Sequence, residues 1–312
     1  MPMGMPCRVE YLQNPVTGVS VIVPCKNECD AIGQVVEQIR ETLAPLDLEY
    51  EVIVVDDGSC DDTRTAALAA GARVLVHNIN LGYGNSIMDG ISVAQYPIIA
   101  MLDGDGTYPV HMLPRLIELA GSHDMVIGNR AWTKHNTNAL GSLMRKGLYY
   151  VILYFSNTRA PDYNSGLRVF HNCNVLNYRP ILCPTFSFTT SLTLLFLLTA
   201  RSVLFVDIDY AKRIGTSKVS YVKDAVRTFS YVFILISLFQ PYRLAILLIL
   251  FGLLTNAAVL LLPLVAPISL GGQIGLHILV TLPVLLSGIS LIAYPMSKLY
   301  LDFLRRRQPD EL

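Results

Sequence analysis

The chain has 312 residues, of which 52% are hydrophobic and 15% are charged, and its positive and negative side chains balance to a net charge of zero. With a mean hydropathy of +0.45, it is too apolar for an ordinary water-soluble domain of this size. The charge balance supplies no electrostatic footprint for nucleic acid, so we expect no nucleic-acid partner.

In chain order, an N-terminal extension of residues 1–18 precedes a region in which strands and helices alternate. The first ten residues hold no apolar core of signal-peptide length, so we expect no secretion, and the scattered cysteines are expected to be reduced thiols. Strands are predicted at residues 19–24, 51–55, 73–76, 98–102 and 124–127, and helices at 29–43, between 63 and 71, from the turn 80–85 to 94, and from 109 onward. This alternation predicts an α/β domain with a mostly parallel sheet, whose functional loops gather at one edge.

The strand at residues 98–102 ends in two carboxylates one residue apart, Asp103 and Asp105. Alternate residues of extended chain point the same way, so both can bind one Mg²⁺ or Mn²⁺ ion that also holds a substrate diphosphate. A simple acidic turn fits the pair equally well. A calcium loop is excluded because the third acidic ligand is absent and Pro114 stands where the final Glu should be.

Polar clusters also follow the other predicted strands. They lie at residues 24–28, 56–59 and 80–84 and at Arg130. Each alone is also typical of a turn, a helix cap or a surface charge, and residues 80–84 lack the third glycine of a dinucleotide-binding fingerprint. Their order along the chain and their shared sheet edge favour one common site.

Taken together, these segments resemble the family 2 glycosyltransferases of the GT-A fold. The resemblance rests on residues 19–28, 52–63, 80–90, 101–109 and 126–130. Two later elements narrow it. Residues 162–168, Asp-Tyr-Asn-Ser-Gly-Leu-Arg, resemble the D-x-x-S-G-[FL]-R element of the dolichyl-phosphate mannose and polyprenyl-phosphate glycosyl synthases, and residues 210–218 resemble their Y-x-x-R-x-G-x-S-K element.

The resemblance implies a role for each matching residue. Nucleotide binding falls to Pro24, Asn27, Glu28, Asp56, Asp57, Gly82 and Asp103. Asp103 and Asp105 are the implied ligands of the Mg²⁺ or Mn²⁺ ion. Phosphate and acceptor binding falls to Arg130, Ser165, Arg168, Arg213, Ser217 and Lys218, and the implied catalytic residues are Asp105, Asp162 and Arg213.

Chemistry refines the role of Asp162, the usual candidate for a base in this family. A phosphate monoester has a second pKa near about 6, so a lipid-phosphate nucleophile is already largely anionic at neutral pH. Such a nucleophile needs positively charged side chains that position it more than it needs a base that removes a proton. We therefore expect Asp162 to orient the acceptor first and to act as a base second. Lys218 is also compatible with a simple membrane-surface charge.

The chain departs from its relatives at three positions near the expected meeting point of sugar and acceptor. Thr190 stands where many relatives carry a Glu, Tyr83 where they often carry Lys or Leu, and Thr107 where mannose synthases often carry Gln. These departures make the identity of the transferred sugar uncertain, and they affect the expected type of reaction less.

The last third of the chain turns towards the membrane. Residues 244–265 and 274–296 contain no charged side chain and are long enough to span the roughly 30 Å of a bilayer core. Lys and Arg lie before the first span and after the second but not between them, so both ends are expected in the cytosol. Residues 221–241 repeat apolar side chains at intervals of three and four, which predicts an interfacial amphipathic helix or a helix packed on the domain core.

The expected domain plan is a GT-A domain at residues 19–220, the amphipathic helix at 221–241, a transmembrane hairpin at 242–297 and a basic cytosolic tail at 298–312. The expected activity is transfer of one sugar, with inversion, from a GDP- or UDP-linked sugar to a polyprenyl phosphate in a membrane, with a homo-oligomer left open. The alternatives are transfer to another membrane lipid, or a nucleotide-sugar-binding membrane protein with impaired catalysis, suggested by Thr190.

Overall fold

The computed structural model describes residues 16–130, 139–172, 175–210 and 221–261 and scattered positions between 271 and 289. The chain divides into two compact units, Met1–Val232 and Phe233–Leu312. We describe each unit by itself.

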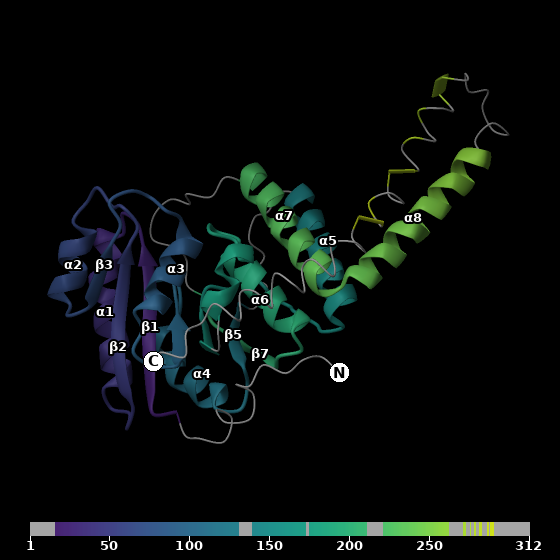
Figure 1. Cartoon of the computed structure of the whole chain (residues 1–312). Helices are drawn as coiled ribbons and strands as arrows, with labels where there is room; N and C mark the ends of the chain where they lie inside the picture. Colours follow the sequence, from purple (N-terminus) through teal and green to yellow (C-terminus); the bar gives the residue numbers. More distant parts are fainter. Residues whose placement is uncertain are drawn as a thin grey trace. The chain divides into compact units, whose positions relative to one another are not determined.

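The first unit is built on a seven-stranded sheet with the order β3-β2-β1-β4-β6-β5-β7 (Figure 1). The strands are β1 (Gly18–Cys25), β2 (Glu49–Asp56), β3 (Arg73–Val76), β4 (Ile98–Met101), β5 (Met125–Arg130), β6 (Arg168–His171) and β7 (Val203–Ile208). Strand β6 runs antiparallel to both of its neighbours, and the other neighbouring pairs are parallel. The expectation of a mostly parallel sheet is therefore confirmed.

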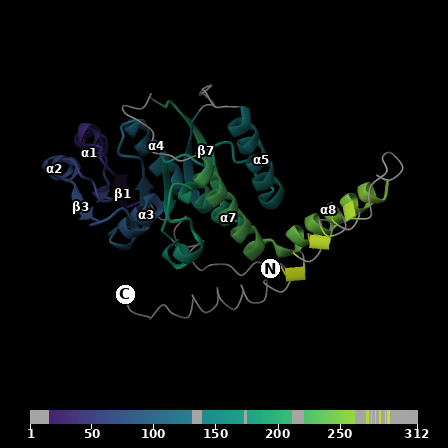
Figure 2. The same ribbon diagram turned by 90° about the horizontal axis from the view of Figure 1, so that it is seen from above.

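Helices cover both faces of this sheet. The helices of the first unit are α1 (Cys29–Leu43), α2 (Thr63–Ala69), α3 (Tyr83–Ser92), α4 (Leu113–Ala120), α5 (Ala139–Ser156) and α6 (Phe188–Leu198), with short 3₁₀ turns at Val110–Met112 and Val175–Ile181. In the turned view of Figure 2, α1 and α4 lie on one side of the strands and α3 on the other.

Side-chain alternation along β1 explains the two layers. Val21 and Val23 join the apolar core that α1 and α4 complete. Ile22 points to the opposite face, where its side chain meets the Cα of Gly90 in α3 so closely that a Cβ there would lie 2.7 Å away. Each of these β1 side chains is fully buried, which stabilises the fold by about 1.5–3 kcal/mol per residue. The alternating pattern is what holds the site-bearing strands between two helical layers.

Most predicted elements are confirmed, with adjusted ends. The helix predicted at 29–43 is α1 with the same bounds, whereas β1 continues through Pro24, opposite Val55 of β2, instead of ending there. The helix expected from residue 109 begins as a 3₁₀ turn and becomes α4 only at Leu113, because Pro114 suits the first turn of an α-helix. Strands β6 and β7 were not predicted.

Two further helices follow, α7 (Tyr221–Phe239), which crosses the boundary between the units, and α8 (Pro241–Leu261) in the second unit. Among the described residues, no single helix is long and apolar enough to cross a membrane. The pair Ala225–Phe239 and Pro241–Ala257 would suffice together, but it bends by 112°. The predicted span at 244–265 overlaps α8 and runs past the described residues, and the second predicted span lies largely outside them.

Candidate active site

The polar clusters that follow the strands meet at one edge of the sheet. Asp56 is the last residue of β2, Arg130 the last of β5, and Asp103 comes two residues after β4. Since β6 is antiparallel, its first residue, Arg168, lies at this same edge. The carboxyl ends of parallel strands are where open α/β sheets bind ligands, so the fold brings the predicted site residues of distant segments together.

Asp103 is the point where the D-x-D motif meets the segment 162–168. The hydroxyl of Tyr83 donates to Asp103 Oδ1 at 2.8 Å. A Cβ on Gly166 would lie 2.9 Å from Asp103 Oδ1 and 3.0 Å from Oδ2, so only glycine fits beside this carboxylate. The N–H of Gly166 in turn donates to the hydroxyl of Tyr108 at 2.6 Å. Residues about 60 positions apart in the sequence are thereby held in contact.

Tyr83 remains a hydrogen-bond donor over the whole neutral range. Burial, and then the negative charge of Asp103, raise the pKa of the Tyr83 phenol well above its usual value. Its ring also packs against that of Phe186, with centroids 5.6 Å apart. Tyr83, one of the positions where the chain departs from its relatives, therefore orients a carboxylate of the expected metal site.

Asp105 is nearly buried, with 5% of its surface exposed. Its Oδ1 accepts hydrogen bonds from the hydroxyl of Thr107 at 2.6 Å and from the Thr107 N–H at 3.2 Å. In the part of the chain that the structure describes, no group of three or more His, Cys, Asp or Glu side chains could hold a metal ion. Two carboxylates nevertheless suit Mg²⁺ or Mn²⁺, which commonly take their remaining ligands from substrate phosphates and water.

Arg130 and Asp162, which the sequence assigns to separate roles, form a bidentate ion pair. Arg130 Nε lies 2.7 Å from Asp162 Oδ2, and Nη2 lies 2.9 Å from Oδ1. The Arg130 N–H also donates to Oδ2 at 3.1 Å, and the guanidinium lies over the ring of Tyr210, 5.3 Å from its centroid. Burial lowers the pKa of Arg130, but the hydrogen bonds to Asp162 outweigh it and hold that pKa above its usual value.

Arg168, for which the resemblance implies acceptor binding, lies inside the fold. It is fully buried, and its guanidinium donates to the backbone oxygens of Ser165 and Thr189, at 3.1 Å each, and to the Thr193 hydroxyl at 3.1 Å. Burial lowers the pKa of Arg168 to about 10. Through these contacts Arg168 braces the loop 162–168 against α6, and its role in acceptor binding stays a prediction. Ser165, also assigned to the acceptor, is fully buried, and its hydroxyl contacts no partner among the described residues.

Asp57, for which the resemblance implies nucleotide binding, clamps the loop 80–84. Its Oδ1 accepts the N–H of Leu81 at 2.7 Å, and its Oδ2 accepts the N–H of Gly82 at 2.9 Å. Gly82 has a φ of 100°, which a residue with a side chain rarely adopts. Both carboxylate oxygens are therefore committed to shaping the backbone that precedes Tyr83.

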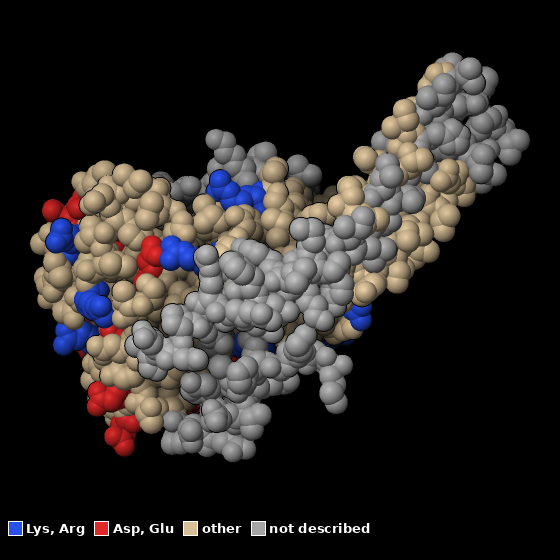
Figure 3. Space-filling model, viewed as in Figure 1, with Lys and Arg blue, Asp and Glu red and all other residues tan. Residues whose placement is uncertain are grey.

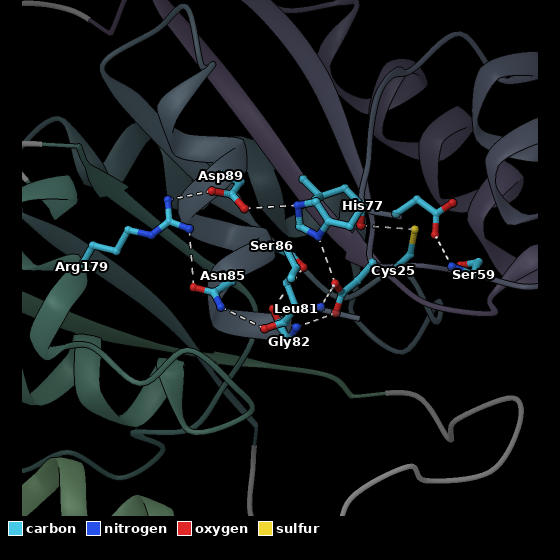
Figure 4. Close-up of polar contacts among 12 residues, drawn as sticks. Cys25, Ser59, His77, Leu81, Gly82, Asn85, Ser86, Asp89 and Arg179 are labelled. Atoms are coloured by element: carbon cyan, nitrogen blue, oxygen red, sulfur yellow. Dashed lines mark hydrogen bonds and ion pairs between the residues drawn. The ribbon is translucent and has the colours of Figure 1, made fainter. Parts of the chain in front are cut away.

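His77 extends this clamp into a series of polar contacts. Its Nδ1 lies 2.9 Å from Asp57 Oδ1 and its Nε2 lies 3.2 Å from Asp89 Oδ2, and Asp89 Oδ1 pairs with Arg179 Nη1 at 2.7 Å. Figure 4 shows His77 between Asp89 and the loop residues Leu81 and Gly82. Both ring nitrogens of His77 therefore face carboxylates, one on each side of the ring. These contacts connect the ends of β2 and β3 to α3 and to the turn at 175–181.

The expected nucleoside pocket is held together by side chains of the loops after β1 and β2. Asn27 adopts a φ of 49°, and its Oδ1 accepts the N–H of Cys60 at 2.8 Å while its own N–H donates to Ser59 Oγ at 2.9 Å. Asp56 is buried, and its Oδ1 accepts the N–H of Ser59 at 3.0 Å. The backbone of Glu28 opens α1. Asn27, Glu28 and Asp56 are thus brought to neighbouring loops.

Three predicted residues, Arg213, Ser217 and Lys218, lie outside the described residues. The structure adds others that the sequence reasoning missed, notably Tyr108, Thr189 and His77. Tyr108 lies three residues after Asp105, and this closeness to the D-x-D is the one feature of the sequence that could have identified it as a site residue. The contacts of Thr189 and His77 depend on the packing of segments far apart in the sequence, so no local sequence pattern predicts them.

Comparisons with known proteins show which family this chain resembles. Residues 20–180 match the model of glycosyl transferase family 2. The chain is 29% identical over 229 residues to an undecaprenyl-phosphate 4-deoxy-4-formamido-L-arabinose transferase of Klebsiella pneumoniae (strain 342), covering 67% of this chain and 64% of that protein. It is 38% identical over 113 residues to an uncharacterized glycosyltransferase of Mycobacterium bovis, covering 36% of this chain and 48% of that protein. The chain thus spans less than two thirds of the length of these relatives.

Solved structures show the same fold at lower identity. Glucosyl-3-phosphoglycerate synthase from Mycobacterium tuberculosis superposes with a TM-score of 0.56 at 16% identity, covering 70% of this chain and 80% of that chain. Mannosyl-3-phosphoglycerate synthase from Rubrobacter xylanophilus gives a TM-score of 0.56 at 17% identity, covering 69% and 73%. These neighbours support a GT-A-like α/β fold. With the family model matching more than half of the chain, the protein belongs to glycosyl transferase family 2.

Proposed function

We propose that this protein transfers a single sugar from a nucleoside-diphosphate sugar to a polyprenyl phosphate at a membrane surface. One observation carries the proposal: the D-x-D carboxylate Asp103 lies directly against Gly166 of the loop 162–168. In the resemblance, these two elements serve the nucleotide-sugar and the acceptor respectively. Their contact gives a sugar donor and an acceptor one place to meet. The name of the undecaprenyl-phosphate transferase from Klebsiella pneumoniae supports a polyprenyl phosphate as the acceptor.

The reaction we propose forms a bond between an acceptor phosphate oxygen and the anomeric carbon, with inversion, while the bond from that carbon to the diphosphate breaks. A Mg²⁺ or Mn²⁺ ion held by Asp103 and Asp105 would supply charge neutralisation for the departing diphosphate. Tyr83 and Thr107 orient these two carboxylates through the hydrogen bonds described above. This support lets the carboxylates keep one geometry during the reaction.

Arg130 and Asp162 are proposed to position the acceptor phosphate as a unit. Asp162 engages Arg130 Nε and Nη2, and no described residue accepts a hydrogen bond from Nη1. A phosphate oxygen can therefore approach the guanidinium without breaking the ion pair, and Arg is well suited to such a contact. The pairing also favours an orienting role for Asp162 over a role as base, because its charge is already matched by a cation.

Exposed apolar side chains support the membrane part of the proposal. Helix α7 exposes Val226, Phe229 and Phe233, whereas Ile236, the next apolar residue of this repeat, is buried. Figure 3 shows charged side chains gathered on the first unit, while α8 is almost entirely without them. Exposed apolar surface of this kind suits a lipid environment. We therefore propose an anchored enzyme whose catalytic unit and chain ends face the cytosol.

The test uses the full purified chain in detergent or lipid nanodiscs with radiolabelled GDP- and UDP-sugars, polyprenyl phosphate, and Mg²⁺ or Mn²⁺. We expect one donor to label the lipid phase, EDTA to abolish the labelling, and Asp105→Asn to reduce it at least about a hundredfold. Asp47→Asn, at an exposed carboxylate between α1 and β2, should leave the rate unchanged. Label that enters only another lipid acceptor, such as diacylglycerol, would refute the polyprenyl phosphate. Binding of a nucleotide-sugar without any transfer would refute catalysis.

A further inference from the structure

The loop 162–168 has one exposed residue in its buried middle. Tyr163, Ser165, Gly166, Leu167 and Arg168 are all buried, whereas Asn164 is exposed. Asn164 stands between Asp162, which is paired with Arg130, and Gly166, which abuts Asp103. Its carboxamide is therefore the polar group that this stretch of the loop offers to solvent beside the proposed metal motif.

Two hydroxyls of α6 hold this carboxamide in one orientation. Asn164 Oδ1 accepts from Thr189 Oγ1 at 2.6 Å and from Thr190 Oγ1 at 3.2 Å, and both threonines are buried. An amide oxygen has two lone pairs, and both are used here. The Nδ2 group, with its two N–H donors, makes no hydrogen bond to any described residue and is left for a ligand.

The support behind the carboxamide is itself braced. Arg168 donates to the backbone oxygen of Thr189 at 3.1 Å, and the Thr193 hydroxyl donates to the backbone oxygen of Tyr163 at 3.0 Å. The loop and the first turns of α6 are thereby joined through buried polar contacts. A donor held in this way loses little conformational entropy when it binds a ligand.

Strand order indicates which part of the substrate reaches Asn164. The expected nucleoside residues follow β1 and β2, the D-x-D follows β4, and the loop 162–168 leads into β6, which lies on the other side of β4. A diphosphate held at the D-x-D thus has its nucleoside over β1 and β2 and its sugar on the β6 side. Resting on the proposed function, we infer that Asn164 recognises the transferred sugar by donating an N–H to one of its oxygen substituents.

Thr190 acquires a role in this inference. A carboxylate at position 190 could only accept a hydrogen bond. It would therefore bind the N–H group of Asn164 and turn that group inward, towards α6. The neutral hydroxyl instead donates to Oδ1 and directs the N–H group outward. The pair Asn164 and Thr190 therefore favours a sugar that has a hydroxyl or carbonyl oxygen within reach of the outward N–H group, and Asn164 is the specificity-determining contact.

The test compares binding of GDP and UDP with binding of their sugar derivatives, UDP-glucose, UDP-N-acetylglucosamine and GDP-mannose among them, by calorimetry on the full chain with Mn²⁺. We expect Asn164→Ala to weaken binding of the preferred nucleotide-sugar about tenfold, the effect of losing one hydrogen bond to a fixed donor. It should leave nucleoside-diphosphate binding and the melting temperature unchanged. Thr190→Val, which removes one orienting hydroxyl, should weaken the same nucleotide-sugar by a smaller factor.

The matched control is Gln95→Ala, which removes an exposed carboxamide just before β4, at the opposite edge of the sheet. It should change neither affinity. Unchanged nucleotide-sugar binding by Asn164→Ala, or an equal loss for the sugar derivative and the bare diphosphate, would overturn the inference while leaving the proposed function standing. If the unmodified protein bound no nucleoside diphosphate with Mn²⁺, the proposed function would fall, and the inference with it.

Discussion

The ion pair between Arg130 and Asp162 makes the sharpest test of the site geometry. Arg130→Met keeps the aliphatic stem against Tyr210 and removes the guanidinium, and Asp162→Asn keeps the shape of the carboxylate and removes its charge. The Arg130 and Asp162 side chains are 27% and 12% exposed. Removing one partner of a buried pair costs about 3–5 kcal/mol, and we reduce this to about 2–3 kcal/mol for the partial exposure of Arg130.

For a folded unit of this size, each kcal/mol shifts the melting temperature by about 2–4 °C, so Arg130→Met should lower it by about 4–12 °C. Thermal unfolding of both single variants and of the double variant gives the coupling energy, which we expect near 2 kcal/mol. Arg115→Met is the control, because the pair of Arg115 and Glu118 has a similar distance, 2.8 Å, but is 56% and 70% exposed. It should cost under about 1 kcal/mol.

The reasoning is refuted if Arg130→Met is no more destabilising than Arg115→Met, or if the coupling energy falls below about 0.5 kcal/mol. Either result would mean that the guanidinium and the carboxylate are not paired in the resting protein. Arg130 would then be available as an independent phosphate ligand and Asp162 as a base.

Three other predictions concern the loops around Asp103. Asp57→Asn replaces an acceptor oxygen of the loop clamp and should destabilise the protein by about 2–4 kcal/mol in thermal unfolding; a change below about 0.5 kcal/mol would contradict the clamp. Gly166→Ala places a Cβ 2.9 Å from Asp103 Oδ1 and should weaken Mn²⁺ binding, measured by electron paramagnetic resonance with nucleoside diphosphate, about tenfold or more; unchanged affinity would argue against a metal at Asp103. Because the pKa of Tyr83 is raised in the fold, its stabilising contribution is complete below the ordinary phenol pKa near about 10 and is lost as the pH rises beyond it. Tyr83→Phe should therefore match the unmodified protein in tyrosinate absorbance at 295 nm up to about pH 11, and a smaller rise in the variant would show that Tyr83 ionises normally.

Local patterns were sufficient for the elements that carry the nucleotide-binding half of the site. Strand β1 and helix α1 follow from β-branched and helical periodicity, and both were predicted nearly to the residue. Strand β6 was not predicted because its sequence is Arg-Val-Phe-His, in which only two apolar residues lie between Arg168 and His171, and both of these end residues are buried. That charge is tolerated in a buried strand because Ser165, Thr189 and Thr193 satisfy it, and such partners cannot be read from neighbouring residues.

The sequence by itself determined the alternating α/β order, the D-x-D after β4 and the apolar character of the last third of the chain, since these depend on local spacing and composition. Only the tertiary structure decided what the polar residues do. Asp57 became a backbone clamp and Arg168 an internal brace, while Asp162 was matched with Arg130, because hydrogen-bonding groups that are buried must find partners wherever the fold supplies them. Asn164 was identified for the opposite reason. Its side-chain oxygen accepts hydrogen bonds from α6, whereas its N–H group contacts no described residue.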